Sequence, residues 1–384
     1  MADEFTAILS TLGLSSEAFI AILILVLLVI GAVVVVIVSR PVLSIYPYLL
    51  PAAKVRARKG RLFDEKQLSE IIEVENSNEF VNYLRGFPDY ANHLDNHSLE
   101  KSLDIQLAET YDLLSRIAPK DISKSFAALA KNSDIINIKS LLAAKESNLN
   151  KDATADLLVP AGSLYHTIEQ LVDANTVEDI VAGLDGTEYS SVLEDALNQY
   201  NESDLILYLE SALDKYYLEN LLSATNVPDN DNTLILHSYI GTLVDVANLK
   251  LIIRAKADNL NYENLDPHMI SRGYQVKDWK LKDLMESENV TSIINGLEGT
   301  DYSSILVDSL PVYDETGSVS IFEKALDDYV VKYAESLSVR NPLGIGPIIG
   351  YLNGKEKEIK NLKIIARAKR EAGFPVSEIQ EMLV

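Results

Sequence analysis

Asn248-Leu-Lys-Leu-Ile-Ile-Arg-Ala-Lys256 is one of three closely related segments in this chain. The other two are Asn137-Ile-Lys-Ser-Leu-Leu-Ala-Ala-Lys145 and Asn361-Leu-Lys-Ile-Ile-Ala-Arg-Ala-Lys369, and Lys54-Val-Arg-Ala-Arg-Lys59 is a fainter copy. In each copy the apolar residues fall on one side of a helix and the basic residues on the other. A long chain that returns to one such segment is predicted to be an all-helical repeat protein.

A glycine motif recurs in step with this segment. Leu184-Asp-Gly-Thr-Glu-Tyr-Ser-Ser-Val-Leu193 returns as Leu297-Glu-Gly-Thr-Asp-Tyr-Ser-Ser-Ile-Leu306, and a diverged copy runs from Leu84 to Leu94 through Tyr90. Gly186 and Gly299 suit the left-handed residue that closes a helix, and Thr187 and Thr300 suit the cap of the next helix. The motif therefore predicts a helix end followed at once by a new helix.

A third motif begins what we expect to be long amphipathic helices. Its copies are Leu99-Glu-Lys-Ser-Leu-Asp104, Leu209-Glu-Ser-Ala-Leu-Asp214 and Phe322-Glu-Lys-Ala-Leu-Asp327. The shared positions Asp104, Asp214 and Asp327 are interpreted as exposed or helix-capping rather than catalytic. Together the motifs predict three homologous helical repeats, over residues 54–131, 132–242 and 243–384. Three large repeats more readily surround an axis than form an open solenoid.

An uncharged stretch precedes the repeats. Phe19 to Val38 contains only Phe, Ile, Leu, Val, Ala and one Gly, and about 20 helical residues cross the ~30 Å hydrocarbon layer. We expect a transmembrane helix over 19–38, after a short extracytoplasmic tail (1–18) and before a juxtamembrane linker (39–53). Pro41, Pro47 and Pro51 are expected to end the helix in that linker. The alternative, a cleaved signal peptide, is disfavoured by an acidic start, a long apolar run and the lack of a small-residue cleavage site.

The charged flanks of this stretch predict its orientation. All nearby basic residues follow it, so the positive-inside rule predicts a single-pass protein of the cell membrane with its body on the cytoplasmic side. Arg56, Arg58 and Arg61 belong to this basic run. They are also candidates for contact with a membrane partner.

The composition excludes several functions. The formal net charge of −23 argues against nucleic acid as a partner, because phosphate binding needs a basic surface. The absence of cysteine excludes disulfides, thiolate catalysis and cysteine-ligated metals. His93 and His97 lie four residues apart but lack the glutamate of a zinc motif, so an exposed turn is expected and no metal site. We expect no cofactor and no catalytic residues.

The chain resembles the C subunit of archaeal A-type ATP synthases, which corresponds to the d subunit of eukaryotic V-ATPases. The resemblance covers about Tyr46 to Val384 and is most specific from Asn341 to Lys369. The structural motif residues within that stretch are Asn341, Pro342, Gly344, Gly346, Pro347, Gly350, Arg367 and Lys369. Read by itself, the Gly344–Gly350 part is not a phosphate loop but a helix start, with Pro347 in the first turn and glycines that allow close packing.

The resemblance implies a funnel of helices with pseudo-three-fold symmetry. It implies a place in the central stalk, between the subunits of the membrane rotor ring and those of the central shaft, in one copy per complex. The implied role is to transmit torque during ion-driven ATP synthesis without chemistry of its own. The transmembrane helix is a departure from many members, and we expect it to occupy the lumen of the ring. The alternatives are a membrane-tethered helical adaptor of another complex and, more remotely, an enzyme on a helical scaffold.

Overall fold

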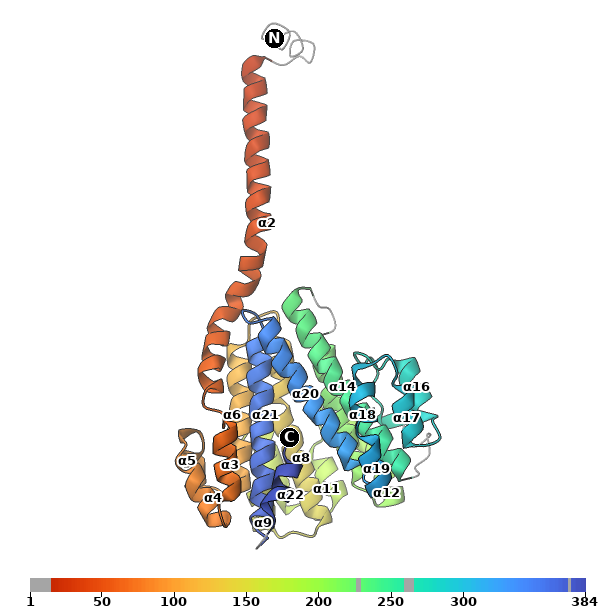
Figure 1. The fold of residues 1–384 in the computed structure, drawn as a ribbon. Coiled ribbons are helices and arrows are strands. Elements are labelled where there is room, and N and C mark those ends of the chain that lie inside the picture. The colour runs from red at the N-terminus through yellow and green to blue at the C-terminus, as the bar shows by residue number, and fades with distance from the viewer. Residues whose placement is uncertain (1–14, 226–228, 259–265, 372–373) are drawn as a thin grey trace. The chain divides into compact units, whose positions relative to one another are not determined.

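A computed structural model describes residues 15–225, 229–258, 266–371 and 374–384 of the chain. All regular structure in these residues is helical, as predicted, and no strand occurs among them (Figure 1). The internal contacts divide the chain into residues 1–49 and residues 50–384, and we call the second part the body. Most of the predicted extracytoplasmic tail, 1–18, lies outside the described residues.

The first long helix is α2 (Ser16–Lys59). Large apolar side chains from Ile20 to Leu43 are between 45% and 67% exposed. By length and composition α2 is long and apolar enough to cross a membrane. A second helix passes the same test, α14 (Asp231–Ala257), but it is largely buried within the body. The exposed α2 and the buried α14 therefore both meet the requirement of length and apolarity, and they differ in burial.

The prolines of the expected linker, residues 39–53, were predicted to end the helix. That prediction is wrong, because α2 continues through all three prolines. A proline removes one backbone donor and crowds the carbonyl four residues earlier. The helix nevertheless continues to Lys59. Pro41, Pro47 and Pro51 consequently interrupt the hydrogen bonding of the helix without ending it.

The body is built from long helices joined by short ones. Its first part contains α3 (Glu65–Glu73), α4 (Ser77–Leu84), α5 (Pro88–Leu94), α6 (Leu99–Ile117) and α7 (Ser123–Ala130). Next come α8 (Asn132–Glu146), α9 (Lys151–Leu157), α10 (Tyr165–Gln170), η1 (Leu171–Asp173), α11 (Val177–Gly183), α12 (Ser190–Ser203) and α13 (Leu207–Ser223). After α14 follow η2 (Asp266–His268), α16 (Asp278–Met285), α17 (Val290–Gly296), α18 (Asp301–Val307), α19 (Leu310–Thr316), α20 (Ser320–Arg340), α21 (Gly346–Ala368) and α22 (Val376–Met382).

Several of these helices begin where a side chain caps the free backbone N–H groups. Asn230 accepts hydrogen bonds from the backbone of Asn232 and Thr233, and a capping box completes the start of α14. Gly186 and Gly299 have φ values of 77° and 85°, which confirms the predicted left-handed residues. Thr300 occupies the N-cap position of α18, but its hydroxyl donates to Leu297 instead of capping the helix.

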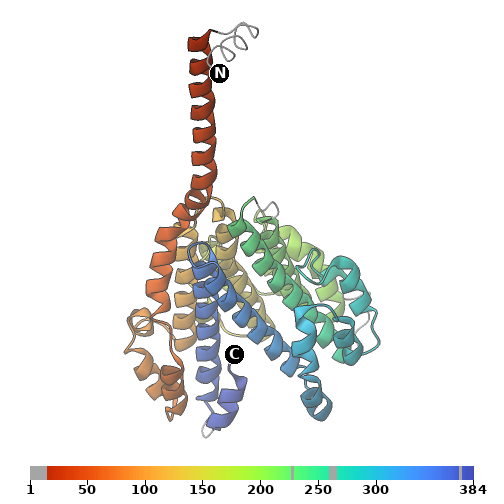
Figure 2. The ribbon, with the colours of Figure 1, turned by 45° about the horizontal axis from the view of Figure 1, so that its top comes forward.

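The two ends of the body share one hydrophobic core. Phe80, Leu84 and Leu103 from its beginning pack in one cluster with Ile359 and Leu362 from its end. α21 lies between α6 and α20 and packs along both, as Figures 1 and 2 show. The repeat boundary predicted at 242 falls inside α14, and the one at 131 coincides with the start of α8. The contacts therefore group the chain differently from the predicted ranges.

We group the body into three modules by these contacts. Module I is α8 to α13, whose buried side chains form one cluster from Ile135 to Leu213. Module II is α14 to α20. Module III joins α21 and α22 to α3–α6, so it contains both ends of the body.

Candidate functional site

A set of polar contacts recurs once in each module, and its first member is an asparagine. Asn137 on α8, Asn248 on α14 and Asn361 on α21 are all buried. Each side-chain amide both donates to and accepts from the backbone of a segment 22 to 24 residues further along, at Val159, Ile270 and Val384 respectively. An amide is suited to this because it carries a donor and an acceptor together. Each asparagine thus holds this later segment against its own helix through hydrogen bonds.

An acidic residue three positions before each asparagine forms the second contact. Asp134, Asp245 and Glu358 are buried, and each accepts a hydrogen bond from a backbone N–H of a loop, at Leu164, Gln275 and Phe63 respectively. Burial raises the pKa of Asp245 to about 6, although the hydrogen bonds from Gln275 and Tyr302 lower it in part.

The tyrosine of the glycine motif belongs to the same set. The Tyr302 hydroxyl donates to Asp245 at 2.9 Å, and the Tyr90 hydroxyl donates to Glu358, which also pairs with the buried Lys355 at 2.6 Å. In module I the equivalent Tyr189 is fully buried, yet its hydroxyl has no hydrogen-bond partner among the described residues. Asp134 instead accepts from the Ser163 hydroxyl at 2.7 Å. The three modules therefore share a plan and differ at this hydroxyl.

A lysine two positions after each asparagine makes the third contact. Lys139 pairs with Asp214, Lys250 with Asp327, and Lys363 with Asp104. The three repeat aspartates are consequently ion-pair partners within their modules; Asp214 is exposed, as predicted, whereas Asp104 and Asp327 are partly buried. Charge pairing holds the first and last long helix of each module together.

Lysines also join each module to the next in cyclic order. Lys101 of module III donates to the Ala155 carbonyl of module I at 3.2 Å, and Lys215 of module I donates to the Pro267 carbonyl of module II at 2.6 Å. Lys324 of module II donates to the Glu381 carbonyl of module III at 2.6 Å. These three contacts therefore link module III to module I, module I to module II, and module II back to module III.

Equivalent positions of the modules meet around one cavity of about 130 Å³, which we call the junction cavity. Asn132, Leu243 and Glu356 precede the recurring asparagines by five residues each, and all three line this cavity. Leu236 and Ile349, twelve residues before their asparagines, also line it, together with Ser125 of α7. Since the same register from three helices converges on one space, the modules are packed about a common centre.

Glu356 is the one ionisable carboxylate that lines the junction cavity among the described residues. Burial raises its pKa to about 7, and the hydrogen bond from the Tyr111 hydroxyl, at 2.8 Å, lowers it less. Tyr217 and Tyr239 line the same cavity from modules I and II. A titratable group thus stands where the three modules meet.

Sequence comparison gives this architecture a family. The profile described as "ATP synthase (C/AC39) subunit" matches residues 51–382. The chain belongs to this family. It is 60% identical over 384 residues, the full length of both chains, to a protein of Methanobrevibacter smithii that is named as the C subunit of an A-type ATP synthase. Proteins of the same name from Methanothermobacter thermautotrophicus and Pyrococcus horikoshii are 51% identical over the full length of both chains and 30% identical over 88% of this chain and 90% of theirs.

Membership confirms the resemblance on which the sequence analysis relied. Members are accessory, non-catalytic subunits of an ATP synthase, so this chain is a subunit of such a complex and not an enzyme by itself.

The predicted motif residues fall at the two ends of α21. Gly346 begins the helix and Pro347 stands in its first turn, which confirms the helix start. Added Cβ atoms would lie 2.3 Å from the Leu337 carbonyl oxygen at Gly346 and 2.8 Å from the Ser338 Cβ at Gly350, so α21 approaches α20 closely, as predicted. Arg367 and Lys369 lie at the other end of α21, about 30 Å away at 1.5 Å per residue.

The remaining motif residues and the basic candidate residues lie in different parts of the body. Asn341 ends α20, and Pro342, in the loop to α21, accepts a hydrogen bond from the Arg56 guanidinium. Gly344 also lies in this loop, against the Asn232 side chain. Arg61 pairs with Asp89 at 3.2 Å, and Arg58 is half-buried. Of the three predicted contact arginines, Arg56 thus lies beside the family motif and Arg61 pairs elsewhere within the body.

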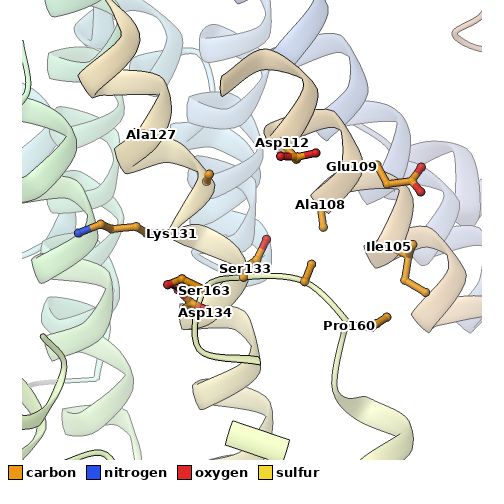
Figure 3. A pocket seen from close by; sticks show the side chains of 13 residues that line it. Ile105, Ala108, Glu109, Asp112, Ala127, Lys131, Ser133, Asp134, Pro160 and Ser163 are labelled. Atoms are coloured by element: carbon orange, nitrogen blue, oxygen red, sulfur yellow. Dashed lines mark hydrogen bonds between the residues drawn. The ribbon is translucent and has the colours of Figure 1, made fainter. Parts of the chain in front are cut away.

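The largest pocket described in the body lies between modules III and I. Its volume is about 550 Å³, and α6, α7, α8 and the loop from Pro160 to Ser163 line it. Figure 3 shows Asp134 and Ser163 together on one wall, with Glu109 and Asp112 on the opposite helix. Much of the lining is small and apolar, and its charged groups do not converge on a single point. We assign it no chemistry.

The two histidines of the predicted turn lie in different surroundings. His97 is exposed, as predicted, and His93 is half-buried with its Nε2 3.2 Å from Glu109. Among the described residues no group of three or more metal-ligating side chains comes together. Sequence reasoning missed Glu356 and the acids at 134, 245 and 358; the common spacing of acid, Asn and Lys is the signal that identifies the latter.

Proposed function

We propose that this chain is the central-stalk subunit that links the membrane rotor ring to the central shaft and transmits torque between them. It would act in one copy per complex, with no cofactor. Family membership supports a place in the ATP synthase, and the cyclic contacts of the body support the mechanical part. The proposed arrangement is a funnel of three helical modules with pseudo-three-fold symmetry.

The observation that carries this proposal is the convergence of Asn132, Leu243 and Glu356 on one cavity. A part that transmits torque must resist bending, because a soft link stores torque as strain. Three modules closed on themselves and packed about a centre resist bending better than an open array, in which each repeat contacts only its neighbours.

The equivalent positions of α8, α14 and α21 also indicate which surface would contact the shaft. One helical turn beyond Asn132, Leu243 and Glu356 lie Ile136, Ala247 and Lys360, and a second turn further lie Ser140, Leu251 and Ile364. All six residues are at least partly exposed. We propose that these positions line the mouth of the funnel and contact the shaft.

The membrane part of the proposal concerns residues 19–38 of α2. A spanning helix attached to a rotating subunit would strike the stator if it lay outside the ring. We therefore propose that it occupies the lumen of the ring, where van der Waals packing would hold it. Arg56 and Arg58, after the helix, would face the cytoplasmic loops of the ring subunits and keep the body in the cytoplasm.

The chain has no cysteine, so single cysteines can be introduced without a background. The complex is purified through a tag on this chain, and cysteines at Val29 and Leu251 carry photo-crosslinkers. We expect Val29 to capture ring subunits and Leu251 a shaft subunit, while the exposed Trp279 serves as the control for unspecific capture. Capture of the stator from Val29, or purification without ring and head subunits, would refute the proposal.

A further inference from the structure

The junction cavity has the properties of a hydrated site. Its volume of about 130 Å³ is several times the roughly 10–15 Å³ of probe-occupied volume that one water needs. Polar atoms reach it from separate elements: Glu356 and Tyr111 from module III, Asn132 and Tyr217 from module I, and Tyr239 from module II. A water molecule requires two to four such partners, and an apolar cavity would stay dry.

One polar atom at this junction lacks a partner. Tyr239 is 2% exposed, and its hydroxyl has no hydrogen-bond partner among the described residues. Burial first and the Glu356 carboxylate second raise the pKa of this hydroxyl, and the nearby Asn353 amide, whose geometry forms no hydrogen bond with it, lowers that pKa in part. Burial and the Glu356 carboxylate also raise the pKa of Tyr217. Leaving a buried hydroxyl unbonded is unfavourable, so a water between these groups is favoured.

Among the described residues, none that lines the cavity is a counterion for Glu356. The groups that face it are the Tyr111 hydroxyl from α6, Tyr217 from α13, Tyr239 from α14 and Asn132 from α8, and none of them is cationic. On α21, Lys355 pairs with Glu358 and Lys360 pairs with Asp327, and the adjacent Lys357 does not line the cavity. A carboxylate in such surroundings is neutralised most simply by a proton.

We propose that the junction cavity is a proton-binding site in which Glu356 holds the proton and ordered water joins its carboxyl group to the hydroxyls of Tyr217 and Tyr239. When Glu356 is protonated, the three modules pack around a neutral group. When it ionises, they enclose an uncompensated charge and the junction weakens. This proposal rests on the cavity alone and does not depend on the proposed function.

The sign of the effect follows from linkage. Because the pKa of Glu356 is about 7 in the folded chain and 4.5 without the fold, the folded state binds the proton more tightly. The stabilisation is present at low pH and is lost as pH rises through about 7. Asp245 follows the same direction with a lower pKa, so the test must compare variants rather than rely on the wild-type profile.

The experiment uses the full chain in detergent, unfolded by urea between pH 5 and pH 8. The variants are Glu356→Gln and, as the matched control, Glu335→Gln at an exposed site on α20. The ratio of the wild-type unfolding constant to that of Glu356→Gln should rise by roughly one to two orders of magnitude from pH 5 to pH 8. With Glu335→Gln the ratio should stay constant. A constant ratio for Glu356→Gln as well would overturn the proposal.

Two further measurements distinguish a hydrated cavity from a dry one and a bound proton from a bound metal cation. Tyr239→Phe should destabilise the chain if water bonds the hydroxyl; an unchanged or more stable variant would show a dry cavity and contradict the proposal. The titration is repeated in sodium, potassium and choline chloride at one ionic strength, and the results should agree. Stabilisation by one metal cation that Glu356→Gln abolishes would assign a cation in place of the proton and overturn the proposal.

Discussion

Lys363 on α21 forms an ion pair with Asp104 on α6, although 259 residues separate them in the chain. The equivalent pairs, Lys139–Asp214 and Lys250–Asp327, each lie within one continuous stretch. The third pair therefore reproduces, between the two ends of the body, a contact that the other modules make locally. The body closes on itself through this module, in which its first and last helices share a core.

We expect this closing pair to contribute more stability than its most exposed counterpart. The Asp104 side chain is 16% exposed, whereas that of Asp214 is 56% exposed, so water screens the Asp104 pair less. Asp104→Asn should lower the free energy of unfolding by about 1 kcal/mol and Asp214→Asn by about 0.5 kcal/mol or less. Urea unfolding of both variants and a double-mutant cycle of Asp104→Asn with Lys363→Met measure the difference. Equal losses would contradict the closing role.

The tyrosine hydroxyls offer a matched pair of substitutions. Tyr302 donates to the buried carboxylate of Asp245, and the equivalent Tyr189 has no partner among the described residues. Tyr302→Phe should therefore cost about 1.5–3 kcal/mol, because it removes a hydrogen bond to a charged group. Tyr189→Phe removes a hydroxyl without a bond and should be nearly neutral. Denaturation midpoints compare the two, and a costly Tyr189→Phe would show that this hydroxyl is bonded in solution.

The turn from α20 into α21 depends on the absence of a side chain at Gly346. A Cβ there would lie 2.3 Å and 2.6 Å from the backbone oxygens of Leu337 and Asn341, and backbone cannot yield as a flexible side chain can. Gly346→Ala should destabilise the body by more than about 2 kcal/mol. Gly60→Ala is the control, since its Cβ would meet ordinary contacts of 3.8 Å and 3.9 Å. Thermal unfolding of the two variants should differ clearly, and similar midpoints would count against the close approach.

The exposed apolar part of α2 should be separable from the fold of the body. The large apolar side chains at 20–38 are exposed, and the hydrophobic cores described for the body contain none of them. A chain that begins at Arg40 should keep the helical circular dichroism of the body and leave the membrane fraction on carbonate extraction. The full chain should stay in that fraction. A shortened chain that remains with membranes would show that another surface binds them.

Several features were open to prediction because they are encoded locally. The Gly186 and Gly299 turns follow from the conformational freedom of glycine, and the start of α21 follows from Pro347 and its neighbouring glycines. The apolar run from Phe19 to Val38 is evident from composition. Pro41, Pro47 and Pro51 misled the prediction because a proline weakens a helix locally, whereas continuation depends on the residues on both sides.

The repeated Asn, Lys and Asp positions were visible in the sequence, but their partners were not. Spacing places Asp104 and Lys363 at equivalent positions, yet no local rule brings residues so distant into contact. The site at Glu356 was hidden for the same reason, since one glutamate in a helix rich in lysine resembles a solvated residue.

The sequence by itself determined the helical character, the repeated register and the membrane-competent apolar run, because helix periodicity, capping and hydropathy act over neighbouring residues. Only the tertiary structure decided that the two ends of the body complete one module and that Glu356 stands without a counterion among tyrosines. Burial and pairing depend on which distant segments meet, and packing of the whole body sets that outcome.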